Sequence, residues 1–324
     1  MNQTDLALTL EPAGDARRPL ALTPGEDLKG YVGSYLGRAL LFLITCSSVL
    51  AVLLILLFVV LRSFSFLSDY SITEFLASRD WRPTAEHPAF GALTIIVGSL
   101  YVSVAALVFA VPLGIMAAVF LSDIVSWRIR NVVKPVVEIL AAIPSVAYGF
   151  FAVLVLAPWL QRTFGFTTGT NALNASLILA IMALPTIISV AEDSISALGR
   201  ELREASYSLG ATRMETIVKV VIPAAHSGII AAVVLGMMRA IGETMVVWMA
   251  SGNATQIPHP WWDVTQSIRT MTATIAGEMG EAPEGSLHRS GLFAIGVLLL
   301  LMTFGLNIVS EYFLSRAKKA AGKA

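Results

Sequence analysis

Charged residues are scarce in this sequence, and their scarcity excludes an ordinary soluble domain. Of its 324 residues, 14% are charged and 56% are hydrophobic, a balance that soluble domains do not reach. Basic and acidic residues number 22 each, so no excess of positive charge indicates nucleic acid as a partner. The chain therefore belongs in a membrane, with lipid as its surroundings.

Cysteine is nearly absent, and several catalytic motifs are missing. The single cysteine, Cys46, lies inside the first apolar run and can form no disulfide within the chain. The sequence has no G-x-x-x-x-G-K-[ST] loop for the phosphates of ATP. It also has no His-Glu-x-x-His motif, no nucleophile with a plausible base, and no histidine at a metal-ligand spacing. These absences argue against an enzyme, a cofactor and a metal site.

Six apolar stretches have, or nearly have, the roughly 20 residues that cross a bilayer. The first, 39–61, has 23 residues and is too long for a cleaved signal peptide, so it is expected to span and to remain. The fourth is the weakest, because Glu192 and Asp193 follow it closely. The sequence thus predicts an all-α membrane protein with six transmembrane helices. The other five stretches are 92–121, 132–156, 175–190, 224–250 and 291–313.

The distribution of basic residues predicts the orientation. With the N-terminus inside, fifteen Lys and Arg residues fall on the cytoplasmic side, six fall outside, and Arg239 lies in the membrane. Both termini and the loop 196–223 are then cytoplasmic. The predicted organisation is a polar tail (1–34), a first helix with its outer loop (35–91), a core that holds the other five spans (92–313) and a short tail (314–324).

Two outer loops, 62–91 and 251–290, are long enough to suggest a contact surface or a lid. The second is expected to contain a helix over 264–279. It also carries Trp261 and Trp262, which are equally consistent with anchors at the membrane interface, where tryptophan is enriched.

Arg239 and Glu243 are the prominent charges in the fifth stretch. Arg239 is the sixteenth of the 27 residues 224–250, a depth at which an arginine costs about 2.5–3.5 kcal/mol on insertion scales. The spacing of four residues predicts an ion pair with Glu243 on one helix face. We expect Arg239 to face a water-filled path and to offer its fork of donors to an oxyanion. The alternative is a pair that only fastens two helices together.

Prolines mark the middle stretches and predict bends that line a cavity. The bend at Pro144 is followed by Ser145 and Tyr148, which are candidate residues of the transport path. A purely structural kink with internally bonded hydroxyls is the alternative. In the same stretch, Glu138 lies four residues after Lys134, a spacing that predicts a pair on one helix.

The cytoplasmic segment 200–223 predicts a protruding helix-turn-helix. A short helix stops at Gly210, and Ala205, Ser206 and Gly210 are small enough for the close approach of a partner protein. A second helical piece follows and leads into the next span at Pro223, where proline is tolerated in a first turn.

This segment resembles the EAA loop of ABC importer membrane subunits. That pattern is Glu-Ala-Ala, a Gly four residues after the second Ala, and then Ile-x-Leu-Pro. Here it reads Glu204-Ala205-Ser206, Gly210 and Val220-Val221-Ile222-Pro223, with small or apolar exchanges at Ser206, Val220 and Ile222. The resemblance implies a type I importer permease fold and a coupling helix seated in a cleft of a separate ATP-hydrolysing subunit.

A narrower resemblance covers about residues 92–313. The stretches 134–149, 238–245 and 270–276 are similar to the C-type permease of phosphate-uptake ABC systems. This resemblance implies phosphate as the substrate, Arg239 and Glu243 as transport residues, and a place in the cell inner membrane. It also implies an ATP-binding subunit, expected as a homodimer, a second homologous permease and an extracytoplasmic phosphate-binding protein.

Two alternatives stay open at this point. The same architecture could serve another oxyanion, sulfate or molybdate. An ion-driven secondary transporter is a different class, but it needs no EAA loop and usually shows repeated halves, which this sequence lacks.

Overall fold

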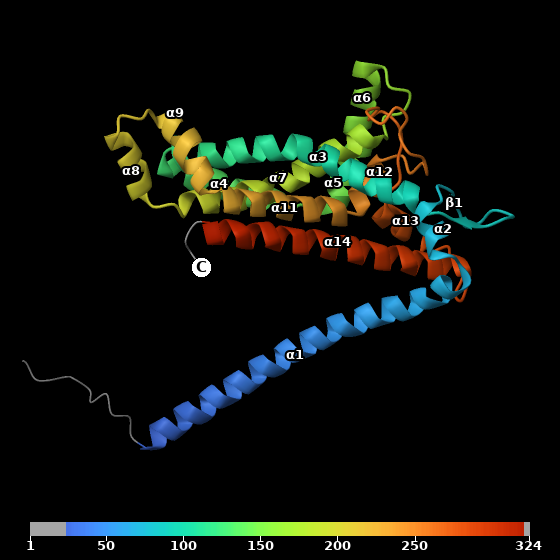
Figure 1. Cartoon of the computed structure of the whole chain (residues 1–324), viewed down its shortest axis with the longest axis horizontal. Coiled ribbons are helices and arrows are strands. Elements are labelled where there is room, and N and C mark those ends of the chain that lie inside the picture. Colours follow the sequence, from blue (N-terminus) through green and yellow to red (C-terminus); the bar gives the residue numbers. More distant parts are fainter. Residues whose placement is uncertain (1–23, 321–324) are drawn as a thin grey trace, which may run out of the picture. The chain divides into compact units, whose positions relative to one another are not determined.

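The computed structural model describes residues 24–320, most of which are helical (Figure 1). This confirms the predicted all-α membrane architecture. Internal contacts divide the chain into one unit that ends at Phe58 and another that begins at Val59, and each is described by itself. Of the predicted tails, residues 1–23 and 321–324 lie outside the described residues, whereas 24–34 and 314–320 are helical.

Helix α1 is longer than the predicted first span. It runs from Pro24 to Asp69 without interruption, and its apolar part, Ser34–Asp69, is long enough to cross a membrane. The predicted range 39–61 followed only the apolar run. The helix continues through the polar flanks because no proline or pair of glycines stops it.

Five helical segments of the described residues are long and apolar enough to cross a membrane, and a bent helix pair raises the number to six. With the bent pair counted as one span, the number agrees with the predicted six, although the boundaries differ, most of all for the first, third and fifth spans. The five are Ser34–Asp69, Leu93–Ile124, Ser145–Phe164, Ala172–Ser196 and Leu287–Val309, and the bent pair is Arg213–Ala224 with His226–Gly242.

The third span was predicted too early in the chain. Helix α4 (Trp127–Ala141) ends before Pro144, and a new helix begins at Ser145. Proline disfavours helical backbone in the residue before it and donates no hydrogen bond, so the two helices cannot join. The spanning segment is instead α5 (Ser145–Phe151), the π-helical turn η2 (Ala152–Leu156) and α6 (Ala157–Phe164).

The fifth span was predicted as one helix over 224–250, and this is wrong in two places. A bend of 71° follows Ala224, where His226 Nδ1 lies 2.7 Å from the carbonyl oxygen of Pro223. A second break follows Gly242. The elements in order are α9 (Arg213–Thr216), η3 (Ile217–Val221), α10 (Ile222–Ala224), α11 (His226–Gly242) and α12 (Met245–Ala250).

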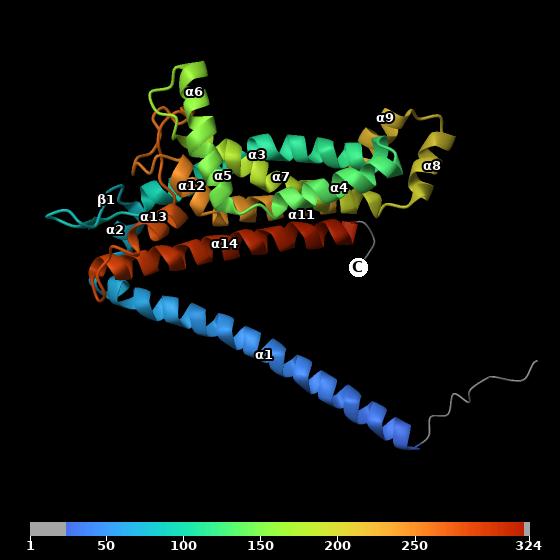
Figure 2. The ribbon, with the colours of Figure 1, turned by 180° about the vertical axis from the view of Figure 1, so that it is seen from behind.

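Helices α3 (Leu93–Val119), α7 (Ala172–Ser196) and α11 pack together, and α14 (Leu287–Ala320) lies along α11 (Figures 1 and 2). Ile187 of α7 fits between Gly114 of α3 and Gly236 of α11. A Cβ atom at either glycine would lie 2.6 Å from a side-chain carbon of Ile187. Small residues therefore permit the close approach on which helix packing in membranes depends.

The two ends of this bundle carry different elements (Figures 1 and 2). One end, called the α8 end, carries the turn η1 (Phe120–Ile124), α8 (Arg200–Ser208) and α9. The opposite end, called the α13 end, carries α6, α2 (Ile72–Ala77), α13 (Met271–Glu278) and a small hairpin. In the hairpin, β1 (Trp81–Arg82) pairs antiparallel with β2 (Ala89–Phe90). The C-terminal end of α14 lies at the α8 end.

Glu278 joins three elements at the α13 end. Its carboxylate accepts hydrogen bonds from Trp81 Nε1 at 2.9 Å and Arg269 Nη1 at 2.5 Å, and His288 Nε2 lies 2.9 Å away.

The helix predicted over 264–279 begins only at Met271. Before it, the hydroxyl of Thr265 and then the amide of Gln266 hold the pKa of Asp263 below its usual range, so this loop is ordered by its own side chains.

The segment before α13 lies directly on α3. A Cβ at Gly98 would lie 2.1 Å from the carbonyl oxygen of Arg269, and Ser99 Oγ accepts a 2.8 Å hydrogen bond from the backbone N–H of Met271. These contacts fix the start of α13 against the bundle.

Gly98→Ala should therefore force α3 and this segment apart. We expect the free energy of unfolding to fall by about 1–3 kcal/mol, the usual cost of overpacking, measured by denaturant unfolding of the purified chain in detergent. Gly305→Ala in α14 is the matched control, because no atom lies within 4 Å of a Cβ there. Equal stability of Gly98→Ala and the unchanged chain would contradict the close contact.

Candidate functional site

Arg239 lies in the last turn of α11, where it reaches two neighbouring helices. Its Nη1 lies 3.3 Å from Thr186 Oγ1 of α7, and its Nη2 lies 3.3 Å from the carbonyl oxygen of Ala141 at the end of α4. Both partners are uncharged. Within residues 24–320, no carboxylate lies within ion-pair distance of this half-buried guanidinium.

The predicted ion pair between Arg239 and Glu243 is wrong. Glu243 follows the last residue of α11 and has extended backbone, with φ −72° and ψ 133°, so the spacing of four residues does not place it on the helix face. Its Oε1 accepts a hydrogen bond from the backbone N–H of Thr244 at 3.2 Å. The charge of Arg239 is therefore left for another partner.

Hydroxyl groups gather around the break at Glu243. Thr272 Oγ1 donates to the carbonyl oxygen of Glu243 at 2.8 Å. The hydroxyl oxygens of Thr272 and Thr270 lie 3.2 Å apart. Together with Ser99 and Ser103 of α3, these residues surround Glu243 so closely that no room for a water molecule is left between them. Sequence reasoning assigned them no role. The signal was the alternation of threonines in 270–274, which places polar groups at the start of a helix.

Tyr148, which follows the bend at Pro144, forms a hydrogen bond within the bend. Tyr148 Oη donates to the carbonyl oxygen of Leu140 at 3.0 Å, which is the internally bonded alternative to a residue of the path. Ser145 begins α5 and is half-buried. This bend approaches Arg239 through the carbonyl of Ala141, and no bond joins Ser145 or Tyr148 to Arg239.

A buried carboxylate, Glu192, holds α4 against α7. It is 1% exposed, and it pairs with Arg130 and with Lys134, whose Nζ lies 2.7 Å from Oε2. Lys134 also pairs with Asp193 at 2.5 Å. The predicted pair of Lys134 with Glu138 is therefore wrong, because the cation points to the neighbouring helix. The sequence signal that was missed consists of two parts: Glu192 and Asp193 directly follow an apolar stretch, and Arg130 and Lys134 lie four residues apart.

The predicted coupling loop 196–223 folds as two short helices at the α8 end. Gly210 follows α8 with a φ of +83°, a value that favours glycine. Thr212 caps α9 through a capping box with Glu215. Ser206 is buried, and its hydroxyl lies 2.9 Å from that of Thr216. Ser206 therefore joins the two helices instead of facing outward as expected.

The exposed surface of this loop is apolar at its tip. Leu209 is 90% exposed and Met214 is 68% exposed, and Glu204, Ala205 and Gly210 are exposed beside them. Pro223 is also exposed, but it lies in α10, at the far end of the second helical piece. The expectation from small residues alone did not include Leu209. A leucine between polar residues gives no sequence signal of its exposure.

The chain belongs to the family of inner membrane components of binding-protein-dependent transport systems. The family model, described as "Binding-protein-dependent transport system inner membrane component", matches residues 110–319. This agrees with the permease resemblance drawn from the loop 200–223.

Two curated relatives match most of the chain. The "Probable ABC transporter permease protein YqgH" of Bacillus subtilis is 40% identical over 258 residues, which cover 80% of this chain and 82% of that protein. The "Phosphate transport system permease protein PstC" of Mesorhizobium japonicum is 37% identical over 267 residues, which cover 76% of this chain and 80% of that protein.

Two solved structures share the fold. A bacterial alginate ABC transporter in complex with a periplasmic protein matches with a TM-score of 0.60 and 15% identity, over 89% of this chain and 98% of that chain. The inward-facing MetNI methionine ABC transporter matches with a TM-score of 0.52 and 18% identity, over 70% and 94%. The predicted fold of an ABC importer permease is confirmed.

Glu192→Gln should weaken the contact between α4 and α7, because Arg130 and Lys134 would lose their buried counter-charge. Both cations are partly exposed to solvent, so we expect a loss of about 1–3 kcal/mol, less than for a fully buried pair. Thermal unfolding in detergent measures the loss. Glu138→Gln is the matched control, since Glu138 is an exposed residue of α4. A similar effect of both substitutions would contradict a specific role of Glu192.

Proposed function

We propose that this chain is the permease subunit of an ATP-driven phosphate importer, in which it forms part of the transport path. The observation that carries the proposal is Arg239, a cation inside an apolar bundle whose partners among the described residues are a hydroxyl and a carbonyl. A charge kept in a membrane without a counter-ion is costly, and such residues usually mark the path of a substrate. The substrate that fits is an anion.

Phosphate is the oxyanion that the relatives favour. The protein of Mesorhizobium japonicum is named a phosphate transport system permease, and proteins with the same name from Pasteurella multocida and Haemophilus influenzae are 33% and 32% identical to this chain. The guanidinium fork suits an oxyanion in two-point contact. Glu243 and the hydroxyls of Thr270 and Thr272 would lie next on the path, with Ser145 and Tyr148 at the bend beside it.

The α8 end would face the cytoplasm and dock a separate ATP-binding subunit, expected as a homodimer. Its exposed tip, with Leu209 beside Ala205 and Gly210, suits an apolar groove on that partner. The α13 end would then face outward and receive phosphate from an extracytoplasmic binding protein. A second homologous permease would complete the path, because one chain supplies one copy of each lining helix. In a cell with two membranes, the complex would lie in the inner one.

Arg239→Lys keeps the charge but loses the fork of donors. We expect phosphate uptake by the complete transporter to fall about tenfold or more, the effect of losing one hydrogen bond to a charged group, and Arg239→Ala to lower it further. Uptake of labelled phosphate, with arsenate, sulfate and molybdate as competitors, measures both the loss and the selectivity. Arg128→Lys on the exposed face of α4 is the control. Normal uptake by a correctly inserted Arg239→Ala complex would refute the proposed path, and stronger competition by sulfate would refute phosphate.

Leu209→Cys tests orientation and docking together. In a Cys46→Ser background it is the chain's one thiol. A membrane-impermeant maleimide should label it in inside-out vesicles that lack the ATP-binding subunit, and labelling should fall when that subunit is present. Glu281→Cys, an exposed position after α13, should be labelled only in right-side-out vesicles. Labelling of both positions from one side would contradict the orientation, and unprotected Leu209→Cys would contradict docking there.

A further inference from the structure

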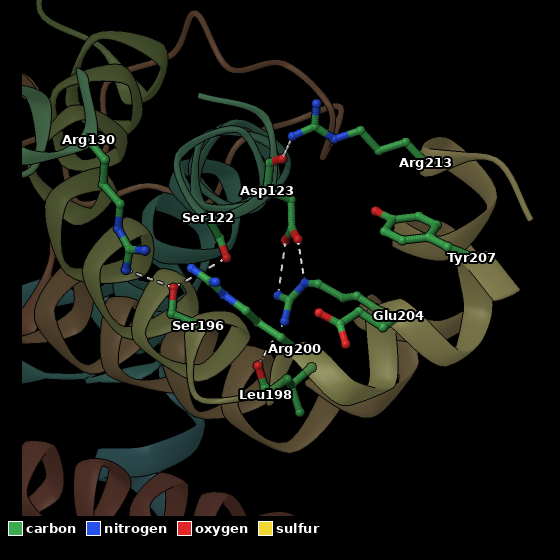
Figure 3. Close-up of a pocket in the computed structure, with 10 residues that line it drawn as sticks. Ser122, Asp123, Arg130, Ser196, Leu198, Arg200, Glu204, Tyr207 and Arg213 are labelled. Atoms are coloured by element: carbon green, nitrogen blue, oxygen red, sulfur yellow. Dashed lines mark hydrogen bonds and ion pairs between the residues drawn. The ribbon is translucent and has the colours of Figure 1, made fainter. Parts of the chain in front are cut away.

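A polar cavity of about 500 Å³ lies beside α8 (Figure 3). Its walls come from η1, α4, the end of α7, α8 and α9, so it is separate from the surroundings of Arg239. Four of its lining side chains are arginines and two are acidic, which leaves an excess of positive charge. The arginines are Arg130, Arg200, Arg203 and Arg213, and the acids are Asp123 and Glu204.

Two of the four arginines are already neutralised by carboxylates. Arg203 Nε donates to Asp123 Oδ1 at 2.7 Å, and its Nη1 donates to the carbonyl oxygen of Leu198 at 2.8 Å. Arg130 pairs with buried Glu192. These two arginines hold the walls of the cavity in place and have little charge left for a ligand.

The other two arginines have no carboxylate partner within the described part of the chain. Arg213 donates only to the backbone carbonyl oxygens of Asp123 and Ile124. Arg200 has no hydrogen bond or ion pair there, although Glu204 lies four residues on along the same helix. Figure 3 shows the side chain of Arg200 extended into the cavity. The hydroxyl of Tyr207 also lines the cavity and has no hydrogen-bond partner among residues 24–320.

We propose that this cavity binds a phosphate group, with Arg200 as the principal contact and Arg213 and Tyr207 as further donors. Guanidinium groups bind phosphate oxygens with two parallel N–H bonds, and here two of them line one cavity with unused donors, that of Arg200 beside Ser122 and Ser196 and that of Arg213 on the other side of Asp123 (Figure 3). The carboxylate of Glu204 lines the same cavity and has no partner in the described part of the chain. It favours a ligand that carries a proton of its own, because only such a ligand can donate to it. Inorganic phosphate is partly protonated near neutral pH, whereas the phosphodiester of a lipid headgroup is not. Inorganic phosphate is therefore the preferred ligand.

The consequence concerns the loop that carries α8. A ligand held by Arg200 of α8 and Arg213 of α9 beside η1 would tie the loop to the end of the bundle. This consequence rests on the proposed function, which makes the α8 end cytoplasmic and phosphate the released product. Phosphate accumulating in the cell would then restrain the coupling loop and slow further import.

The test uses the assembled transporter in nanodiscs of phosphatidylcholine. Phenylglyoxal modifies accessible arginines, and peptide mass spectrometry follows the rate at each one. Inorganic phosphate at ten times its dissociation constant should slow modification of Arg200 roughly tenfold, because only the unoccupied fraction reacts. Arg128, exposed on α4 at the same end, should react at an unchanged rate. Arg213→Gln should raise the half-protecting phosphate concentration about tenfold.

Further measurements distinguish inorganic phosphate from a lipid headgroup as the ligand, and failure of this site from failure of the transport path. Protection in nanodiscs of phosphatidylglycerol without phosphate would keep the phosphate-group site but assign it to a lipid headgroup. Equal protection by chloride at the same ionic strength, or none in any arm, would overturn the site. So would an Arg200 that reacts only after the ATP-binding subunit is removed, since that partner would then fill the cavity. Protection should persist in Arg239→Ala, so failure of the transport path and failure of this site are distinguishable.

Discussion

In a membrane, backbone groups freed by a break in a helix must find partners inside the protein, and this constraint organises the structure. The bundle is broken near Pro144, after Ala224 and after Gly242, and each break has a side chain that compensates for it. Tyr148 donates to Leu140, His226 lies against the carbonyl of Pro223, and Thr272 donates to Glu243.

Two of these breaks, near Pro144 and after Gly242, lie beside residues predicted for the transport path, namely Ser145, Tyr148 and Glu243. Irregular backbone at membrane depth is tolerated where it is buried in protein or lines a cavity. Arg239 takes part in the same scheme, because one of its donors reaches the freed carbonyl of Ala141 at the end of α4. The guanidinium is thereby held by neutral groups that leave its charge available. A substrate anion would gain this charge without displacing a carboxylate.

The ionisable groups of the bundle divide into two kinds. Glu192 is buried with two cations and serves to fix α4 on α7, and Glu278 joins three elements at the opposite end in a similar way. Arg239 and Arg200 have no such counter-charge within the described residues. The buried structural charges are thus paired, whereas Arg239 and Arg200 are the two residues for which we propose an anionic ligand.

The class of protein could be predicted from the sequence alone. Low charge, long apolar runs and the spacing from Glu204 to Pro223 predicted a helical membrane permease with a coupling loop, because burial in lipid imposes length and composition on each span. The sequence also identified Arg239, since a lone arginine at that depth is conspicuous. These inferences depend on composition and local spacing, which the sequence shows directly.

The positions of the helix breaks and the pairing of the charges became known only from the folded structure. The spacing of Arg239 and Glu243 predicted an ion pair, but α11 ends between the two residues. The spacing of Lys134 and Glu138 also predicted an ion pair, but Lys134 pairs instead with Glu192 of another helix. The inward turn of Ser206 and the exposure of Leu209 depended likewise on contacts between α8 and α9. The partners in these contacts are distant in sequence. They are set by helix packing and by the need to neutralise buried charges, and neither can be read from the spacing of residues along the chain.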